Sequence, residues 1–400
     1  MIQSSLKEDW RSFKQLPTVE RGYVLMLLIT LAPTAINFLR PICTRFGIPT
    51  DFINEIIWTI VLLMGAPYVL KKAKVGDWVI YLAIVSFYLI SPLFYPTSSE
   101  FVSENMVGFL LQTLPFYFVG RALDFNLFNR YFIWIARIGV FVGVLFALAF
   151  SAGFTSSIEI TADNMVAAYN LLWPSLYLTW YAIEKDSMMD KVMSVVSIFV
   201  LLSFGTRGPA VALVVFFVAY LLFFRQYKRN YLVKSLILAA GVIIFQYLEV
   251  ILTAIMFLSE SLGLSTRVFE SILYRDSTDD VTAGREDLYT DIVSLIKNNP
   301  DGYGFGGDRI FTGAYSHNIE LEMLISFGTV LGSIFLLGML LLFVRALRKS
   351  WGTELCSFLL ILMCFPLIQL QFSGTFCNST ALFLLIGISV TALNFKEKNE

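Results

Sequence analysis

Residues 319–344 read IELEMLISFGTVLGSIFLLGMLLLFV, an apolar run long enough for a helix to cross roughly 30 Å of membrane hydrocarbon. Residues 231–258, YLVKSLILAAGVIIFQYLEVILTAIMFL, form a second such run. Between them lies a polar segment, residues 259–318, with five basic residues, ten carboxylates and His317, the only histidine of the chain. A charged, glycine-punctuated segment of this length between two membrane spans indicates where the chemistry of the protein would be found.

The composition of the whole chain is that of a polytopic membrane protein. Of its 400 residues, 57% are hydrophobic and 15% are charged, whereas soluble domains carry about 25% charged residues. The sequence therefore predicts an all-α fold: one multi-pass membrane domain over residues 1–400 with about twelve transmembrane helices. Residues 259–318 would form a large extracytoplasmic loop between the ninth and tenth of these helices. The net charge of −1 gives no sign of a nucleic-acid partner.

The distribution of lysine and arginine predicts the orientation in the membrane. With the N-terminus in the cytoplasm, most of the 29 basic residues fall in cytoplasmic segments, as the positive-inside rule requires. We therefore expect both termini in the cytoplasm. The polar segment and the hairpin Gly205-Thr-Arg-Gly208 would share the outer face.

Near residues 285–298 the polar segment predicts an amphipathic helix. Leu288, Ile292 and Ile296 recur at helical spacing, with charged residues on the opposite face. The turn residues 299–302, Asn-Pro-Asp-Gly, end the pattern. We expect this helix to lie along the membrane surface, with its apolar side on lipid or on the helical bundle.

Two arginines are candidates for an anion-binding site. Arg207 stands at the expected outer start of a helix, where free N–H groups and a guanidinium fork suit phosphate or pyrophosphate. Arg285 begins the amphipathic helix on the same face, and Arg309 is a weaker candidate of the same kind. The alternative for Arg207 is an anchor on lipid headgroups. The alternative for Arg285 is a solvated ion pair with a neighbouring carboxylate.

His317 is the candidate general base. Ser316 is expected to cap the following helix, which would place the imidazole at the first helical turn. The positive end of that helix disfavours imidazolium, so the ring should be neutral, as a base must be. Glu320, one turn further on, could orient the ring. The alternative is a histidine that only caps the helix or forms local hydrogen bonds.

Glycines and one buried acid complete the set of candidates. Gly302, Gly304 and Gly307 fit a dinucleotide fingerprint, but no strand precedes them and the loop faces away from cytoplasmic cofactors. They are interpreted either as backbone that lets a ligand approach closely, at Gly304 above all, or as a bare turn. Gly328-x-x-x-Gly332 is typical of close helix packing. Glu249 is the one carboxylate well inside an apolar run, and such acids are usually functional. The alternative is a carboxylate that a helix kink or a partner helix satisfies.

No pattern in the sequence indicates a metal site or a cofactor. The four cysteines share no metal-ligand spacing. No cluster of carboxylates and histidines stands out in the segments expected on the outer face. We therefore expect neither a metal nor a cofactor.

Four short stretches together resemble the bacterial O-antigen polymerases and O-antigen ligases. They are Phe204-Gly-Thr-Arg-Gly-Pro-Ala210, Gly284-Arg-Glu-Asp-Leu-Tyr289, Asn299-Pro-Asp-Gly-Tyr-Gly-Phe-Gly306 and Ser316-His-Asn-Ile-Glu-Leu-Glu322. Each stretch is short and degenerate, and the resemblance lies in their order, their spacing and their shared outer face. The glycine-rich and Ser-His-Asn stretches look more like those of polymerases than those of ligases.

The resemblance implies a membrane glycosyltransferase that needs no metal. In such enzymes an acceptor sugar hydroxyl attacks, with inversion, the anomeric carbon of a glycan carried on undecaprenyl pyrophosphate at the outer face of the cytoplasmic membrane. By matching motifs, Arg207 and Arg285 would bind the pyrophosphate, and His317 would activate or position the hydroxyl. A polymerase joins O-antigen or capsular repeat units, whereas a ligase moves the finished polymer to lipid A core.

The resemblance also implies partners. They are the lipid-linked oligosaccharide, the surrounding membrane lipids, and a chain-length regulator and a flippase of the same pathway.

A different class of protein is also compatible with the sequence. About twelve spans and Glu249 suggest a transporter of polysaccharide or lipid-linked sugar. A transporter built of two equal halves, however, has its main break after the sixth span. This chain has only a short polar segment there, residues 184–191.

Overall fold

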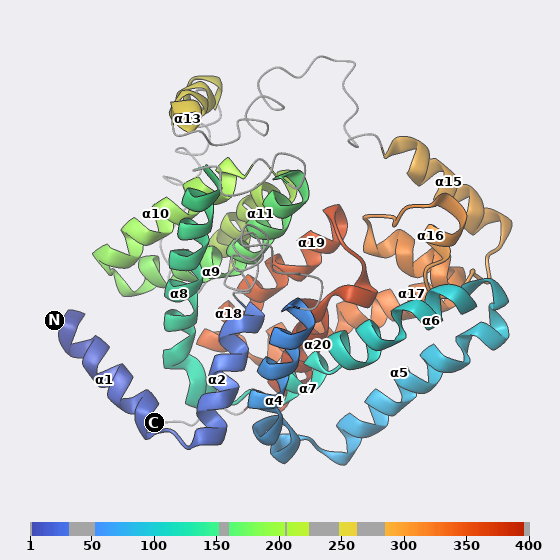
Figure 1. Ribbon diagram of the computed structural model, residues 1–400, viewed down its shortest axis with the longest axis horizontal. Helices are drawn as coiled ribbons and strands as arrows, with labels where there is room; N and C mark the ends of the chain where they lie inside the picture. The colour runs from blue at the N-terminus through green and yellow to red at the C-terminus, as the bar shows by residue number, and fades with distance from the viewer. Residues whose placement is uncertain are drawn as a thin grey trace. The chain divides into compact units, whose positions relative to one another are not determined.

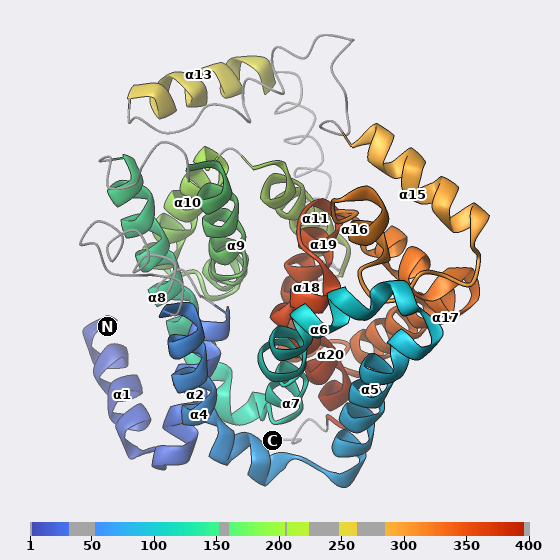
Figure 2. The same ribbon diagram turned by 45° about the vertical axis from the view of Figure 1, so that its right-hand side comes forward.

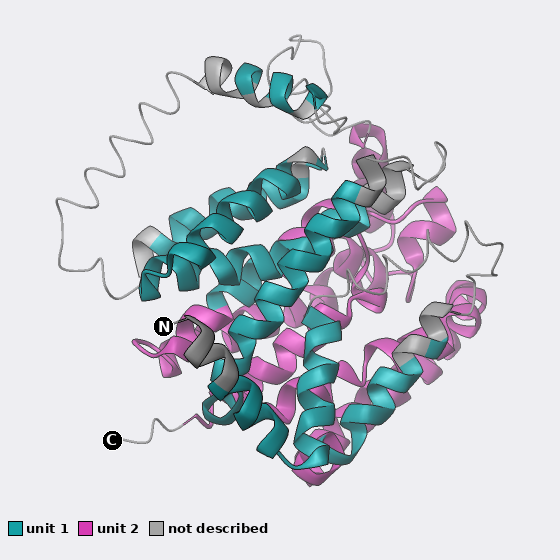
Figure 3. Ribbon diagram, turned by 60° about the vertical axis from the view of Figure 1, so that its left-hand side comes forward, with its two compact units in different colours: residues 1–68, 124–277, 360–365 teal, residues 69–123, 278–359, 366–400 magenta. Residues whose placement is uncertain are grey.

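The computed structural model describes residues 2–31, 53–151, 160–204, 206–223, 248–261 and 285–395. Within these ranges all regular secondary structure is helical, which confirms the predicted all-α class. Helices are suited to a membrane, because each satisfies its backbone N–H and C=O groups within its own segment. The chain divides into two compact units (Figure 3), each described separately below.

Unit 1 comprises residues 1–68, 124–277 and 360–365. Its helices are α1 (Ile2–Gln15), α2 (Thr18–Leu31), most of α4 (Ile53–Lys72), α8 (Phe125–Ser151), α9 (Ile160–Lys185), α10 (Met188–Ser203), α11 (Arg207–Phe223) and α13 (Leu248–Ser261). Helix α9 contacts α8, α10 and α11, and its Trp173 and Tyr177 are almost fully buried. Arg137 and Asp190 form a bidentate ion pair, with both N–O distances 2.8 Å, that ties α8 to α10.

Unit 2 comprises residues 69–123, 278–359 and 366–400. Its helices are α5 (Val75–Phe94), α6 (Ser99–Val107), the π-helix η2 (Gly108–Thr113), α7 (Phe116–Arg121), α15 (Glu286–Asn298), α16 (Gly307–Thr312), α17 (Ile319–Lys349), most of α18 (Glu354–Cys364), α19 (Pro366–Phe372) and α20 (Thr380–Ala392). Helix α20 packs on α7 and α17 (Figure 1). Arg121 of α7 joins Asp77 of α5 at 2.6 Å and Thr391 of α20 at 2.8 Å, so one side chain ties three helices.

Four stretches of the described helices are long and apolar enough to cross a membrane. They are Val75–Phe94, Phe125–Leu148, Ile319–Lys349 and Glu354–Phe372. The chain is therefore a multi-pass membrane protein. The predicted total of about twelve spans stays a prediction, because much of the run before the polar segment, and residues 262–284 within it, lie outside the described residues.

Helix α17, predicted as one membrane span, is broken at Gly328. There φ is 75° and ψ is 173°, a conformation that favours glycine. A Cβ atom on Gly328 would lie 2.4 Å from the carbonyl oxygen of Pro300, and one on Gly302 would lie 2.4 Å from the Gly328 nitrogen. The predicted role of Gly328 in helix–helix packing is therefore wrong: this glycine lets the loop before α16 touch the backbone of the broken helix.

Backbone hydrogen bonds fix the glycine-rich loop, residues 299–307, on this break. The N–H of Tyr303 donates to the carbonyl of Ile325 at 2.9 Å, and that of Gly304 donates to Ser326 at 2.8 Å. In an unbroken helix these carbonyls would accept N–H groups four residues further along the chain. The loop therefore supplies the donors that the break removes.

An aromatic anchor adds to the backbone bonds. Phe305, at the centre of the loop, is 2% exposed. Its ring lies 4.7 Å from the ring of Tyr88, 4.9 Å from that of Phe327 and 6.0 Å from that of Phe376, measured between centroids. A buried phenylalanine of this kind typically contributes about 3–5 kcal/mol relative to alanine.

Helix α15 occupies the segment for which the sequence predicts an amphipathic helix. Its Ile292 and Ile296 are buried together with Ile325 of α17. Figure 2 shows α15, α16 and α17 beside one another, and α15 contacts both of the others. Of the two surfaces that the sequence left open, lipid or protein, the structure places this apolar face on protein.

We expect Gly328→Ala to destabilise the protein by about 2–4 kcal/mol, since it adds backbone strain and a steric overlap at Pro300. Gly338→Ala is the matched control on the same helix, because a Cβ atom there meets no atom within 4 Å and alanine favours a helix. Thermal unfolding in detergent measures both variants. Equal midpoints for the two would show that the loop does not depend on the break.

Candidate functional site

The candidate site lies in unit 2, where α15, α16 and α17 begin. Arg285 immediately precedes α15, Arg309 lies in the single turn of α16, and His317 comes just before α17. Arg285, Arg309 and His317 thus each lie at or near the start of a helix, and the docked loop, residues 299–307, joins the end of α15 to the start of α16.

The backbone that leads to His317 is held by a buried carboxylate, that of Asp308. Asp308 is 0% exposed. Its side chain accepts the backbone N–H of Arg309 at 2.9 Å and that of Ser316 at 2.7 Å. Because a buried carboxylate is stable only when hydrogen-bonded, this pair of bonds closes residues 308–316 into a loop of defined shape.

His317 has an unusual backbone conformation, and its ring lies close to that of Tyr315. Its φ of 51° lies in the left-handed region, which residues with side chains adopt rarely and which is concentrated at functional sites. Its ring centroid lies 3.9 Å from that of Tyr315. Its Nδ1 atom is buried and has no hydrogen-bond partner among the described residues.

The prediction that Ser316 caps α17 is wrong. The cap is Asn318, whose backbone is extended (φ −152°, ψ 116°) and whose side chain accepts the N–H of Leu321 at 2.9 Å. An extended residue directly before the first helical one has the geometry that a cap requires. The Ser316 hydroxyl instead donates to the carbonyl of Asn318 at 3.0 Å.

Glu320 makes a different contact from the one predicted. Its two carboxylate oxygens each accept the amide of Gln371 at 2.8 Å. The Gln371 oxygen in turn accepts the side-chain N–H of Asn318 at 3.1 Å. Glu320 therefore supports the helix cap beside His317, and no hydrogen bond joins it to the imidazole among the described residues.

Burial and two guanidinium groups keep the imidazole neutral. Burial is the largest cause that lowers the pKa of His317, followed by the charge of Arg285 and then that of Arg309, and the pKa falls to about 4. A hydrogen bond to the backbone of Phe372 acts in the opposite direction. The lowered pKa agrees with the predicted neutral state, and burial and the two arginines are its causes.

The two arginines are held in different ways. Arg285 is half-buried, and its Nη1 donates to the carbonyl of Phe372 at 2.9 Å. The guanidinium of Arg309 lies 5.0 Å from the ring centroid of Phe101 and 5.4 Å from that of Tyr315, within the range of cation–π attraction. The alternative weighed for Arg285, a solvated ion pair with Glu286 or Asp287, is not seen among the ion pairs of the described residues.

Two predicted residues belong to unit 1. Arg207 is the first residue of α11, and Glu249 lies in the first turn of α13. The side chains of both lie outside what the structure describes. Their predicted roles therefore stay predictions.

The glycine-rich run packs against the protein's own side chains. A Cβ atom on Gly304 would lie 2.7 Å from the Ser98 hydroxyl oxygen and 2.7 Å from Tyr95. The close approach that the sequence assigns to a ligand at Gly304 is thus made to residues of the same unit.

Sequence reasoning missed Asp308, Tyr315 and Gln371. No local pattern predicts a bond between Asp308 and Ser316, or between Gln371 and Glu320, because both depend on how separate segments fold together. The only signal for Asp308 in the sequence was its position directly after the glycine run, in a segment that holds several candidate site residues.

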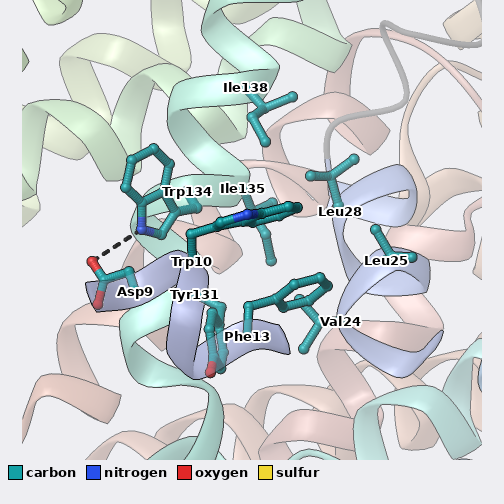
Figure 4. A pocket seen from close by; sticks show the side chains of 10 residues that line it. All are labelled: Asp9, Trp10, Phe13, Val24, Leu25, Leu28, Tyr131, Trp134, Ile135 and Ile138. Carbon is teal, nitrogen blue, oxygen red and sulfur yellow. Dashed lines mark hydrogen bonds between the residues drawn. The ribbon is translucent and has the colours of Figure 1, made fainter. Parts of the chain in front are cut away.

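A cavity lies elsewhere, within unit 1. It has a volume of about 240 Å³ and is lined by side chains of α1, α2 and α8, among them Trp10, Phe13 and Ile138 (Figure 4). The indole N–H of Trp134 donates to Asp9 at 3.2 Å at its edge. None of the predicted site residues lines this apolar cavity.

Among the described residues, no group of three or more His, Cys, Asp or Glu could hold a metal ion.

Comparison with known proteins identifies one family. Residues 192–336 match a protein-family model described as O-antigen ligase, and this range contains Arg207, Arg285, Arg309 and His317. No curated protein and no solved structure matches the chain. The match confirms the resemblance to O-antigen polymerases and ligases and gives no support to the transporter alternative. Over residues 192–336 the chain is therefore similar to the O-antigen ligase family, a family of membrane glycosyltransferase-like enzymes.

Proposed function

We propose that this protein polymerises O-antigen or capsular repeat units. It would transfer glycan from undecaprenyl pyrophosphate to a hydroxyl of another lipid-linked repeat unit, with inversion and without a metal. The observation that supports this function best is a half-buried imidazole whose pKa is lowered by burial and by two guanidinium groups, inside the range that matches the family.

The reaction needs a base and a site for the leaving group. The acceptor hydroxyl oxygen bonds to the anomeric carbon while the bond from that carbon to the pyrophosphate oxygen breaks on the opposite face. The electron pair leaves with the pyrophosphate, whose charge Arg285 and Arg207 stabilise. The hydroxyl proton passes to the neutral ring of His317, at the unpartnered Nδ1.

We place the reaction at the outer face of the cytoplasmic membrane, with both termini in the cytoplasm. The asymmetric distribution of lysine and arginine supports this orientation. The convergence of Arg207 with Arg285 and His317 is part of the proposal. A chain-length regulator and a flippase would be partners of the same pathway.

A ligase is the second candidate, because the matching family model is described as one. The sequence of the glycine-rich stretch, residues 302–306, and of the Ser-His-Asn stretch, residues 316–318, favours the polymerase. The two enzymes differ in acceptor: another lipid-linked unit for the polymerase, and lipid A core for the ligase.

Purified protein in liposomes, given undecaprenyl-pyrophosphate-linked repeat units, should yield a ladder of longer lipid-linked glycans on a gel. Supplying lipid A core as well separates the two candidates, since a ligase would transfer glycan to it without forming a ladder. If neither product forms, the glycosyltransferase proposal is wrong.

We expect His317→Gln to lower kcat by about 10²–10⁴-fold, the usual contribution of a general base. Arg285→Met should also lower activity, because it removes positive charge from the leaving-group site. Lys297→Met is the matched control: this exposed lysine lies at the other end of α15, and its loss should leave the ladder unchanged. A stable His317→Gln protein with the wild-type kcat would exclude a catalytic role for the imidazole.

The pH profile of kcat/KM should reflect the free enzyme. Since the pKa of His317 is about 4, kcat/KM should hold steady as the pH falls through 6.5 and should decline only near pH 4, where the ring becomes protonated. In Arg285→Met the decline should begin at a higher pH, because a charge that lowers this pKa is gone. A wild-type decline of kcat/KM centred near pH 6.5 would contradict the lowered pKa of His317.

A further inference from the structure

Arg309 is a guanidinium that the proposed reaction leaves without a role. It is half-buried in α16 and lies over the rings of Phe101 and Tyr315. No ion pair joins it to a carboxylate in the part of the chain that the structure describes. The adjacent carboxylate of Asp308 is already occupied by two backbone N–H groups.

The ring of Tyr315 links Arg309 to the base. It lies 5.4 Å from the Arg309 guanidinium and 3.9 Å from the His317 ring, measured to its centroid. Arg285 reaches the same histidine from another element: its guanidinium donates to Phe372, whose backbone also bonds to His317. Two cations from separate segments of the chain therefore lower the pKa of one imidazole.

We propose that Arg309 is a further binding residue for the diphosphate of the donor, and that the bound diphosphate makes His317 a stronger base by neutralising Arg285 and Arg309. The inference rests on the proposed function, since the anion is the pyrophosphate of the lipid-linked donor. It adds a coupling: the base becomes effective once the donor occupies its site.

The physical reason is electrostatic. Burial and two positive charges lower the pKa of His317 to about 4, and such a base is weak at neutral pH. A bound dianion opposes both positive charges, so the pKa rises toward its ordinary value while burial still holds it below that value. A stronger base then meets the acceptor hydroxyl.

Other charged groups near His317 cannot replace the anion. Asp308 of α16 is bound to backbone N–H groups. Glu320 of α17 is bound to Gln371. Glu322 of α17 is buried, and its carboxylate accepts the hydroxyl of Thr375 and the N–H of Phe376.

The single histidine makes the test direct. In protein labelled with ¹⁵N-histidine, only His317 gives an imidazole signal, so its titration follows this ring alone. We expect its pKa to rise by about 1 or more when inorganic pyrophosphate saturates the site, the size of shift that nearby charges commonly produce. Calorimetry on the same samples measures the affinity for pyrophosphate.

Substitutions of Arg309 distinguish an effect of its charge from a purely structural effect. Arg309→Met should raise the pKa of His317 in the free protein, weaken pyrophosphate binding about ten-fold or more, and reduce the pKa change on binding. Arg309→Lys keeps the charge and should restore much of each effect, which a purely structural role of the arginine would not allow. Lys297→Met is again the control and should titrate and bind like the wild type.

Three results would overturn the inference. The first is equal pyrophosphate affinity in the wild type and in a folded Arg309→Met protein. The second is a His317 pKa that does not change in saturating pyrophosphate, and the third is pyrophosphate that does not bind the wild type. The glycan ladder is an independent readout: with it intact, any of the three rejects this inference but not the proposed function.

Discussion

The docking of residues 299–307 on the broken helix α17 is the constraint on which the site depends. A helix break within an apolar segment leaves backbone carbonyls without partners, and this is costly where water is excluded. The N–H groups of Tyr303 and Gly304 supply the partners, and Phe305 anchors the loop among aromatic rings. The break and the polar loop therefore stabilise each other, and neither would persist alone.

The docked loop also helps to fix the backbone at His317. The loop leads directly into α16, where the carboxylate of Asp308 holds the backbone of Ser316. Ser316 precedes His317, and Asn318 then caps α17. The left-handed backbone of His317 is thus held from both sides, which is how a conformation of higher energy persists at a functional site. The result is a half-buried imidazole whose pKa is lowered by burial and by the charges of Arg285 and Arg309, which suits the proposed reaction, whose leaving group is an anion.

Much of this could be predicted from the sequence, because its signals are local. The apolar runs indicated membrane helices, and the spacing of Leu288, Ile292 and Ile296 indicated α15. His317 was selected as the only histidine of the chain, and Arg285 and Arg309 as basic residues of the same segment. Non-local features could not be predicted. Gly328 looked like a helix-packing glycine, but its role as a break appears only once the loop is docked on it.

The remaining differences have the same origin. Ser316 and Asn318 are both good caps, and the left-handed turn at His317 decides between them. Glu320 is bound to Gln371, 51 residues away, so its partner could not be read from the neighbouring sequence. The predicted meeting of Arg207 with His317 joins residues of two separate units and rests on the shared family match rather than on local geometry.

The most direct test of the account is a structure of the protein in a lipid nanodisc with undecaprenyl pyrophosphate bound. The account predicts the diphosphate within about 3 Å of the guanidinium groups of Arg207, Arg285 and Arg309, with His317 facing the position of the anomeric carbon. Diphosphate bound at another place, with these four side chains remote from it, would contradict the central claim.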